Sequence, residues 1–157
     1  MPIFISHSVA PRELALVNGV ADVVAERGET PIIPDRDWDS PAEPLPSRIT
    51  AQIRSSDYVI AIASRWGRHI NWLNQEIIYS QQLLPPSPFL IVADVEVPVA
   101  QGYACIRINR SDPLATLSQV SSQIQRLVQD REMQSLLKGF LVGGLALLFL
   151  SSLEESK

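Results

Sequence analysis

Short apolar runs alternate with segments of helical periodicity through the first 110 residues of the chain. The runs lie at residues 3–5, 31–34, 58–63, 89–93 and 104–108, and the run at 58–63 is apolar throughout. Such a run is typical of a strand buried on both faces, and helices between such strands are typical of a parallel sheet. We therefore predict an α/β fold with an open, parallel, five-stranded sheet and flanking helices.

A second feature is a stretch of fifteen residues without a charge, at 139–153. As a helix it spans roughly 22 Å, less than the ~30 Å hydrocarbon core of a bilayer. A start at Leu136, with the Lys138 ammonium reaching the interface, makes the span just adequate. We predict a hydrophobic helix at 136–153 that anchors the chain in a membrane. A buried oligomerisation helix and a helix packed on the chain's own domain are the alternatives.

The predicted domain boundaries follow from these two features. Residues 1–110 form the α/β domain, residues 111–135 a helix that continues from it, and residues 136–153 the hydrophobic helix. Lys138 precedes the apolar stretch, and Glu154 and Glu155 follow it. Because basic flanks stay on the cytoplasmic side, we expect a cytoplasmic domain.

Composition excludes several kinds of partner. Thirteen Lys and Arg against seventeen Asp and Glu give a net charge of −4, which argues against a nucleic-acid partner. Cys105 is the single cysteine, and His7 and His69 are the only histidines. These counts exclude an internal disulfide and argue against a metal site, so we expect no metal.

Polar and aromatic residues gather after the predicted strands. In an open α/β sheet, ligands bind outside the carboxyl ends of the strands, where the strand order reverses. The residues at these ends are our candidates for substrate binding: Ser6, His7, Ser8, Trp38, Ser64, Arg65 and Trp72. We expect the first strand to stop at Ser6, where main-chain N–H groups and hydroxyls could hold a diphosphate.

The order of these motifs resembles the TIR (Toll/interleukin-1 receptor) domain family. The resemblance covers about residues 2–110 and includes IFISHS at 3–8, the acidic loop at 35–45, SSDYVI at 55–60 and WLNQE at 72–76. It implies a flavodoxin-like arrangement of the sheet. Two differences stand out: Leu73 replaces a frequent cysteine, and the acidic loop holds Pro41, Pro44 and Pro46 instead of its usual glycine.

The resemblance also implies an activity. Enzymatic TIR domains cleave NAD+ at the nicotinamide–ribose bond, and the family's catalytic glutamate falls on Glu76. We expect Glu76 at the rim of the site, with Trp72 on the same helix face. Trp38 would be an adenine platform or a lid, and Arg65 a phosphate contact. The structural alternative makes Glu76 a solvated helix residue and Trp72 a core anchor.

Taken with the resemblance, the sequence predicts an NAD+ nucleosidase of a bacterial type, with or without cyclisation of the ADP-ribose product. It would act after assembly into a homo-oligomer, in anti-phage defence, under an upstream sensor or effector protein. NAD+ or a related nucleotide is then a substrate, and no cofactor is expected. A non-enzymatic TIR adaptor and an enzyme like the nucleoside deoxyribosyltransferases are the alternatives.

Overall fold

The computed structural model describes residues 1–84, 89–99 and 102–154, with side chains as far as residue 135. Its centre is a five-stranded sheet in which all neighbouring strands are parallel. The strand order is β2-β1-β3-β4-β5, so it reverses between β1 and β3. The bounds are β1 Pro2–Ser8, β2 Thr30–Ile32, β3 Tyr58–Ala63, β4 Phe89–Ala93 and β5 Ala104–Arg107. The predicted α/β class and parallel five-stranded sheet are confirmed.

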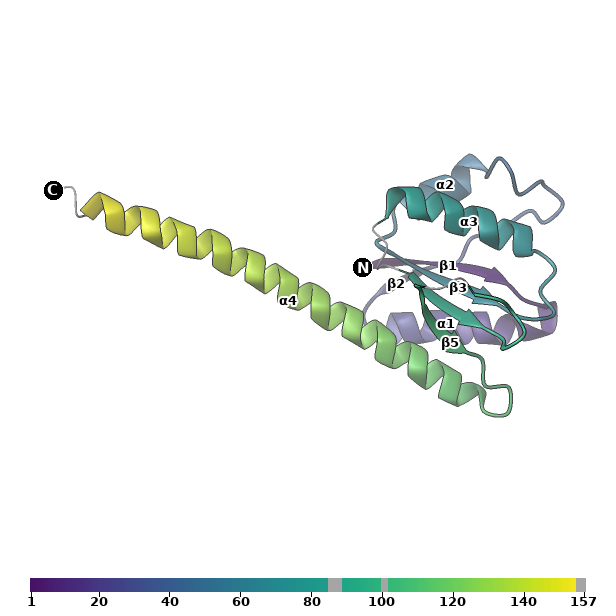
Figure 1. The fold of residues 1–157 in the computed structure, drawn as a ribbon. Helices are drawn as coiled ribbons and strands as arrows, with labels where there is room; N and C mark the ends of the chain where they lie inside the picture. Colours follow the sequence, from purple (N-terminus) through teal and green to yellow (C-terminus); the bar gives the residue numbers. More distant parts are fainter. Residues whose placement is uncertain (85–88, 100–101, 155–157) are drawn as a thin grey trace. The chain divides into compact units, whose positions relative to one another are not determined.

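Helices cover both faces of this sheet (Figure 1). Helices α2 (Ser47–Arg54) and α3 (Ile70–Leu83) lie on one face, and α1 (Leu14–Glu26), which follows the short 3-10 helix η1 (Pro11–Glu13), lies on the other. The face under α2 and α3 holds a buried cluster that both helices share with three strands: Phe4, Ile49, Ile53, Val59, Trp72 and Phe89. Burial of these large apolar side chains fixes α3 against the sheet.

The first strand is longer than predicted. It was expected to stop at Ser6, yet β1 runs to Ser8 and pairs with β3 at every step from Ile3 to Ser8. Pairing with the wholly buried β3 extends it, because a buried main chain must have hydrogen-bond partners. The main chain of residues 6–8 is therefore part of the sheet, and recognition there falls to side chains.

Helix α4 (Pro113–Glu154) follows β5. The chain divides into two units, Met1–Ser121 and the part from Ser122 onward, which holds the rest of α4. Within the first unit, the start of α4 packs beside α1: a Cβ at Gly19 would lie 3.0 Å from Leu117, and Arg27 donates a hydrogen bond of 2.7 Å to the Ser121 hydroxyl.

The segment predicted as a membrane anchor or oligomerisation helix, 136–153, lies beyond the residues whose side chains are described. Its backbone continues α4 as a helix to Glu154. Among the residues whose side chains the structure describes, no helix is long and apolar enough to cross a bilayer. The predicted domain boundaries and the anchor therefore stay predictions.

Candidate functional site

Glu76 lies on the inward face of α3, together with Trp72, Leu73 and Ser80. Spacings of three and four residues place all four side chains on one stripe of the helix, directed at the sheet. The expectation that Glu76 stands at a rim is wrong, because the residue is 0% exposed. A carboxylate in such a place needs strong partners to offset its lost hydration.

Arg36, four residues beyond β2, supplies the main partner. Its Nε donates to Glu76 Oε1 over 2.8 Å, and its Nη2 donates to Oε2 over 2.5 Å. The Ser6 hydroxyl donates to the same Oε2 over 2.5 Å, and Arg36 Nη1 donates to the carbonyl of His7 over 2.9 Å. The side chains of Arg36 and Glu76 are both fully buried. Both oxygens of Glu76 are therefore engaged within the protein.

Trp38 covers this ion pair. Its ring stacks on His69 with centroids 4.0 Å apart, and it meets His7 and Trp72 edge-on at 5.9 and 6.3 Å. The guanidinium of Arg36 lies 4.9 Å from the same ring. Trp38 is 36% exposed, so one part of it faces water while the rest packs on the domain. In this conformation Trp38 covers the ion pair and the residues around it. We call the following seven residues the glutamate cluster: Ser6, His7, Arg36, Trp38, His69, Trp72 and Glu76.

His7 is the one polar side chain of the glutamate cluster with an unused buried atom among the residues described. Its Nδ1 has no hydrogen-bond partner there. Burial, and then the charges of Arg36 and His69, lower the pKa of His7 from 6.5 to about 4. The ring is therefore neutral at neutral pH. A neutral imidazole with a free nitrogen can accept a hydrogen bond from a ligand hydroxyl.

Ser8 holds the loop before α3. Its hydroxyl accepts a hydrogen bond of 3.2 Å from the main-chain N–H of His69. Gly67 makes this approach possible, because a Cβ at that position would overlap the carbonyl and hydroxyl oxygens of Ser8. The contact places His69 where it can stack on Trp38.

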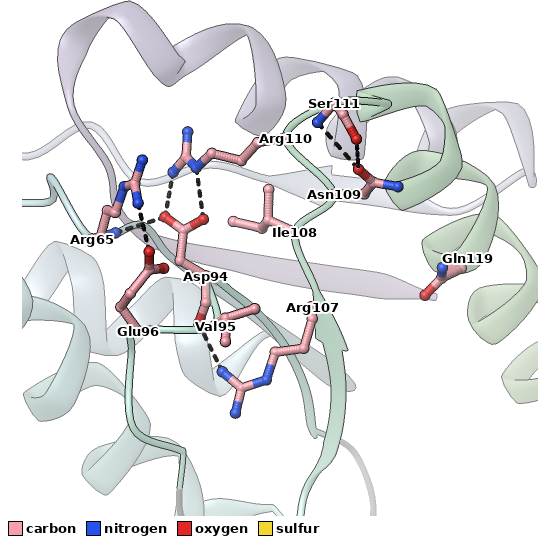
Figure 2. Close-up of a pocket in the computed structure, with 10 residues that line it drawn as sticks. All are labelled: Arg65, Asp94, Val95, Glu96, Arg107, Ile108, Asn109, Arg110, Ser111 and Gln119. Carbon is pink, nitrogen blue, oxygen red and sulfur yellow. Dashed lines mark hydrogen bonds and ion pairs between the residues drawn. The ribbon is translucent and has the colours of Figure 1, made fainter.

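Two predicted site residues belong elsewhere. The Ser64 hydroxyl donates to Glu13 over 2.5 Å, and the Arg65 guanidinium donates to Glu96 over 2.5 Å. The main-chain N–H of Arg65 donates to Asp94 over 2.8 Å. Arg65 thus joins a second group of charged side chains around Asp94 (Figure 2). Ser64 is linked to this group through Glu13, which accepts a hydrogen bond from Arg110. Of the predicted site residues, Ser6, His7, Trp38, Trp72 and Glu76 come together in the glutamate cluster, and Ser8 touches it through His69.

Sequence reasoning missed Arg36 and Asp94 as partners. Arg36 is the one basic residue in an otherwise acidic loop that follows a strand, which was a usable signal. Asp94 directly follows β4 at the carboxyl edge of the sheet, where ligands of such folds bind. Within the part of the chain that the structure describes, no group of three His, Cys, Asp or Glu side chains could hold a metal ion.

Comparison with known proteins gives a family and several similar structures. The family model described as "TIR domain" matches residues 3–128. A search of curated proteins gives no match. One similar structure is the crystal structure of a prokaryotic SEFIR domain. The two sequences are 14% identical, the TM-score is 0.49, and the alignment covers 77% of this chain and 90% of that chain. Another is the SEFIR domain of interleukin-17 receptor B, whose sequence is 13% identical. Its TM-score is 0.45, and the alignment covers 78% of this chain and 95% of that chain. Because the family model spans most of the chain, the protein belongs to the TIR domain family.

Proposed function

We propose that this TIR domain is an NAD+ nucleosidase in which Glu76 is the catalytic residue and Arg36 holds it inactive. The observation that carries the proposal is the burial of the Glu76 carboxylate at the carboxyl edge of the sheet, beside the point where the strand order reverses. Buried ion pairs contribute little net stability compared with apolar side chains of similar size. An ion pair at this position is therefore better explained by a functional role.

The chemistry needs few groups. When the nicotinamide–ribose bond breaks, its electron pair goes to the nicotinamide nitrogen and the ribosyl carbon becomes oxocarbenium-like. A carboxylate such as Glu76 stabilises that developing positive charge. Water then adds to the ribosyl carbon and loses a proton, which yields ADP-ribose; attack by a group of the substrate itself would yield a cyclic product. Once the loop has moved, the Nδ1 of His7, which has no partner within the described residues, would accept a hydrogen bond from a ribose hydroxyl.

The closed arrangement supports control of this activity. A substrate ribose cannot reach Glu76 while Arg36 and Ser6 bind both of its oxygens and Trp38 covers them. The loop that carries Arg36 and Trp38 must move before catalysis. We infer that assembly of several copies, or a signal from a partner protein, provides the energy for that movement.

The test compares NAD+ turnover in two variants that share one change. Arg36→Gln removes the cation and keeps the carboxylate, so we expect turnover at least equal to that of the parent protein. The double variant, Arg36→Gln with Glu76→Gln, removes both charges. We expect its turnover to be lower than that of Arg36→Gln alone by a factor of about 10²–10³. Glu76→Gln alone would leave a buried arginine without its partner, at a cost of about 3–5 kcal/mol. Arg36→Gln leaves the buried carboxylate without its cation at a similar cost while the loop stays closed, so thermal melting must first show that both variants are folded.

Glu26→Gln is the matched control, because Glu26 is exposed at the end of α1. It should turn over NAD+ as the parent does. Product analysis after incubation of the full chain in detergent reports nicotinamide and the ADP-ribose isomer directly. Equal turnover in the single and double Arg36 variants would disprove the role of Glu76.

A non-enzymatic TIR adaptor is the second candidate. The complete engagement of Glu76 within the protein favours it, since the ion pair could simply hold the loop after β2 against the sheet. No turnover by the parent protein or by Arg36→Gln, under conditions in which the chain assembles, would support the adaptor. The family match gives no support to a deoxyribosyltransferase.

We further propose that residues 136–153 anchor the domain at the cytoplasmic face of a membrane or join copies of the chain. The support is the uncharged run at 139–153 and the charges on either side of it. Either arrangement would raise the local concentration of the domain and favour assembly. A role in anti-phage defence is consistent with an NAD+-consuming activity that is silent until assembly.

A further inference from the structure

A pocket lies at the carboxyl ends of β3, β4 and β5, and the proposed NAD+ chemistry does not use it. Its volume is about 840 Å³, and three arginines line it: Arg65, Arg107 and Arg110. Figure 2 shows these side chains around Asp94, which follows β4. None of the three contacts the glutamate cluster in the interactions that the structure describes. The pocket therefore needs its own explanation.

Asp94 organises the arginines. It accepts hydrogen bonds from the main-chain N–H of Arg65 over 2.8 Å and from Arg110 Nε over 2.7 Å, and Arg110 Nη2 pairs with it as well. Burial acts to raise the pKa of Asp94, but the hydrogen bonds and the charges of Arg110 and Arg65 outweigh it and hold that pKa below its ordinary value. The carboxylate stays charged and keeps the Arg110 guanidinium in a fixed position.

Arg107 is held differently. Its Nη1 donates to the carbonyls of Asp94 and Val97 over 2.7 and 2.9 Å. Within the described part of the chain, no carboxylate forms an ion pair with Arg107. A guanidinium carries five N–H donors, and these two bonds use only one of its nitrogens. Arg107 thus presents an uncompensated positive charge in a fixed orientation at the pocket.

Three guanidiniums gather around the ring of Trp66, beside the pocket. The guanidiniums of Arg12, Arg65 and Arg110 lie 4.4, 4.1 and 4.2 Å from its ring centroid. The aromatic ring draws the three cations together although they repel one another. Among the residues that line the pocket, three guanidiniums face two carboxylates, those of Asp94 and Glu96, and Arg107 is the guanidinium without an ion pair in the described part of the chain. A network built only to stabilise the fold would have no need of this third guanidinium.

We propose that the pocket binds a small anion that carries a diphosphate, such as a nucleoside diphosphate derivative. Planar guanidiniums in fixed positions suit phosphate oxygens, because each can donate two parallel hydrogen bonds. A volume of about 840 Å³ is within the usual range for sites of this kind. The site is independent of Glu76 and of the NAD+ nucleosidase proposal.

Calorimetric titration of the full chain in detergent tests the site with two probes, inorganic pyrophosphate and ADP-ribose. We expect saturable binding of both at physiological salt. Tighter binding of ADP-ribose would identify a nucleotide as the occupant, and equal binding would identify the diphosphate alone. Arg107→Gln should weaken binding by about tenfold or more, as loss of a charged hydrogen bond does. Arg65→Gln provides a second test if Arg107→Gln fails to fold, as judged by thermal melting.

Arg54→Gln is the control of equal charge, since Arg54 lies at the end of α2 and contacts Tyr79 instead. It should bind both probes as the parent does. Inorganic pyrophosphate lacks the ribose that the glutamate cluster is proposed to bind, so the double variant Arg36→Gln with Glu76→Gln should bind pyrophosphate as the parent does. Absence of saturable binding to the parent, or equal affinity in the Arg65, Arg107 and Arg54 variants, would overturn the proposal. A third outcome would also overturn it: neither probe binds, the parent self-associates, and Arg107→Gln abolishes that self-association. The pocket would then be a contact between copies.

Discussion

Arg36 and Glu76 bring two full charges into a place that water does not reach. Separate burial of either charge would cost several kcal/mol, and their two hydrogen bonds offset that cost only while both side chains stay in place. The pair therefore couples the loop after β2 to α3 in an all-or-none manner. A partner or substrate that displaced Arg36 would leave Glu76 free to act on a positive centre.

His7 should make stability depend on pH in a defined window. Because its native pKa is about 4 and its ordinary value is 6.5, the unfolded chain takes up a proton on His7 at a higher pH than the folded chain does. Stability should thus fall as pH falls from about 6.5 to about 4, by roughly 3 kcal/mol in total. Urea denaturation at a series of pH values measures this, and His7→Gln should flatten the curve in that window.

The pH dependence that arises from His7 can be told apart from the loss of stability that arises when carboxylates such as Asp94 take up protons. That group starts from 3.8, so its contribution to stability is lost at lower pH than the His7 window. A parent protein whose stability stays level between pH 6.5 and 4.5 would show that His7 titrates normally in the folded chain.

At the scale of elements, the acidic loop between β2 and α2 is attached to the domain in two parts: Arg36 and Trp38 hold its first half, and Ala42 and Leu45 pack its second half against the apolar cluster under α2 and α3. The side chain of Arg36 extends from the loop into the domain and is fully buried, and the ring of Trp38 packs on His7, His69 and Trp72. In contrast, Asp35 is exposed and its ion pair with Arg48 is long, at 3.7 Å. Such exposed pairs contribute little. Release of the first half of the loop therefore requires that Arg36 and Trp38 give way, whereas Ala42 and Leu45 can keep the second half in place.

Trp38→Ala should weaken NAD+ binding and cost little stability. Its ring is 36% exposed, so its loss removes less buried apolar surface than the loss of a core tryptophan and should lower the Tm clearly less. Calorimetry of the variant measures the Tm, and titration with a non-hydrolysable NAD+ analogue measures the affinity.

Trp72→Ala is the matched comparison, because Trp72 is 4% exposed and belongs to the apolar cluster under α3. Its loss should cost about 3–5 kcal/mol. If Trp38→Ala lowered the Tm as much as Trp72→Ala does, Trp38 would be a core residue and the adenine platform would have to be abandoned.

For the whole molecule, the apolar run at 139–153 should decide how the chain behaves in solution. An uncharged helix of that length carries a large apolar surface that must be covered by lipid, detergent or another copy. We expect residues 1–134 to be soluble without detergent, and the full chain to require detergent, lipid or an oligomer. Gly143 and Gly144 would allow close contact between neighbouring helices.

Size-exclusion chromatography with light scattering compares the two forms directly. A full chain that ran as a monomer in detergent-free buffer would contradict both the anchor and the oligomerisation helix. The same run on the Gly143→Leu variant separates them, because that change should disturb contact between copies more than insertion into lipid.

The sequence by itself determined the fold class, the two central strands β3 and β4, and the family. Continuous apolar runs predicted β3 and β4 at their observed bounds, because a strand buried on both faces has no polar positions. The order of the motifs from residue 3 to Glu76 predicted the TIR family, which the family model confirms. These are properties of short windows and of their order along the chain.

Only the tertiary structure decided which side chains meet. Arg36 and Glu76 are 40 residues apart, and they pair because β2 lies beside β1 while α3 packs over the same edge. Periodicity carries no information on such contacts, since they depend on strand order and on the path of the loops. The same reason placed Arg65 with Asp94 instead of Glu76, and it turned an expected rim carboxylate into a buried, closed one.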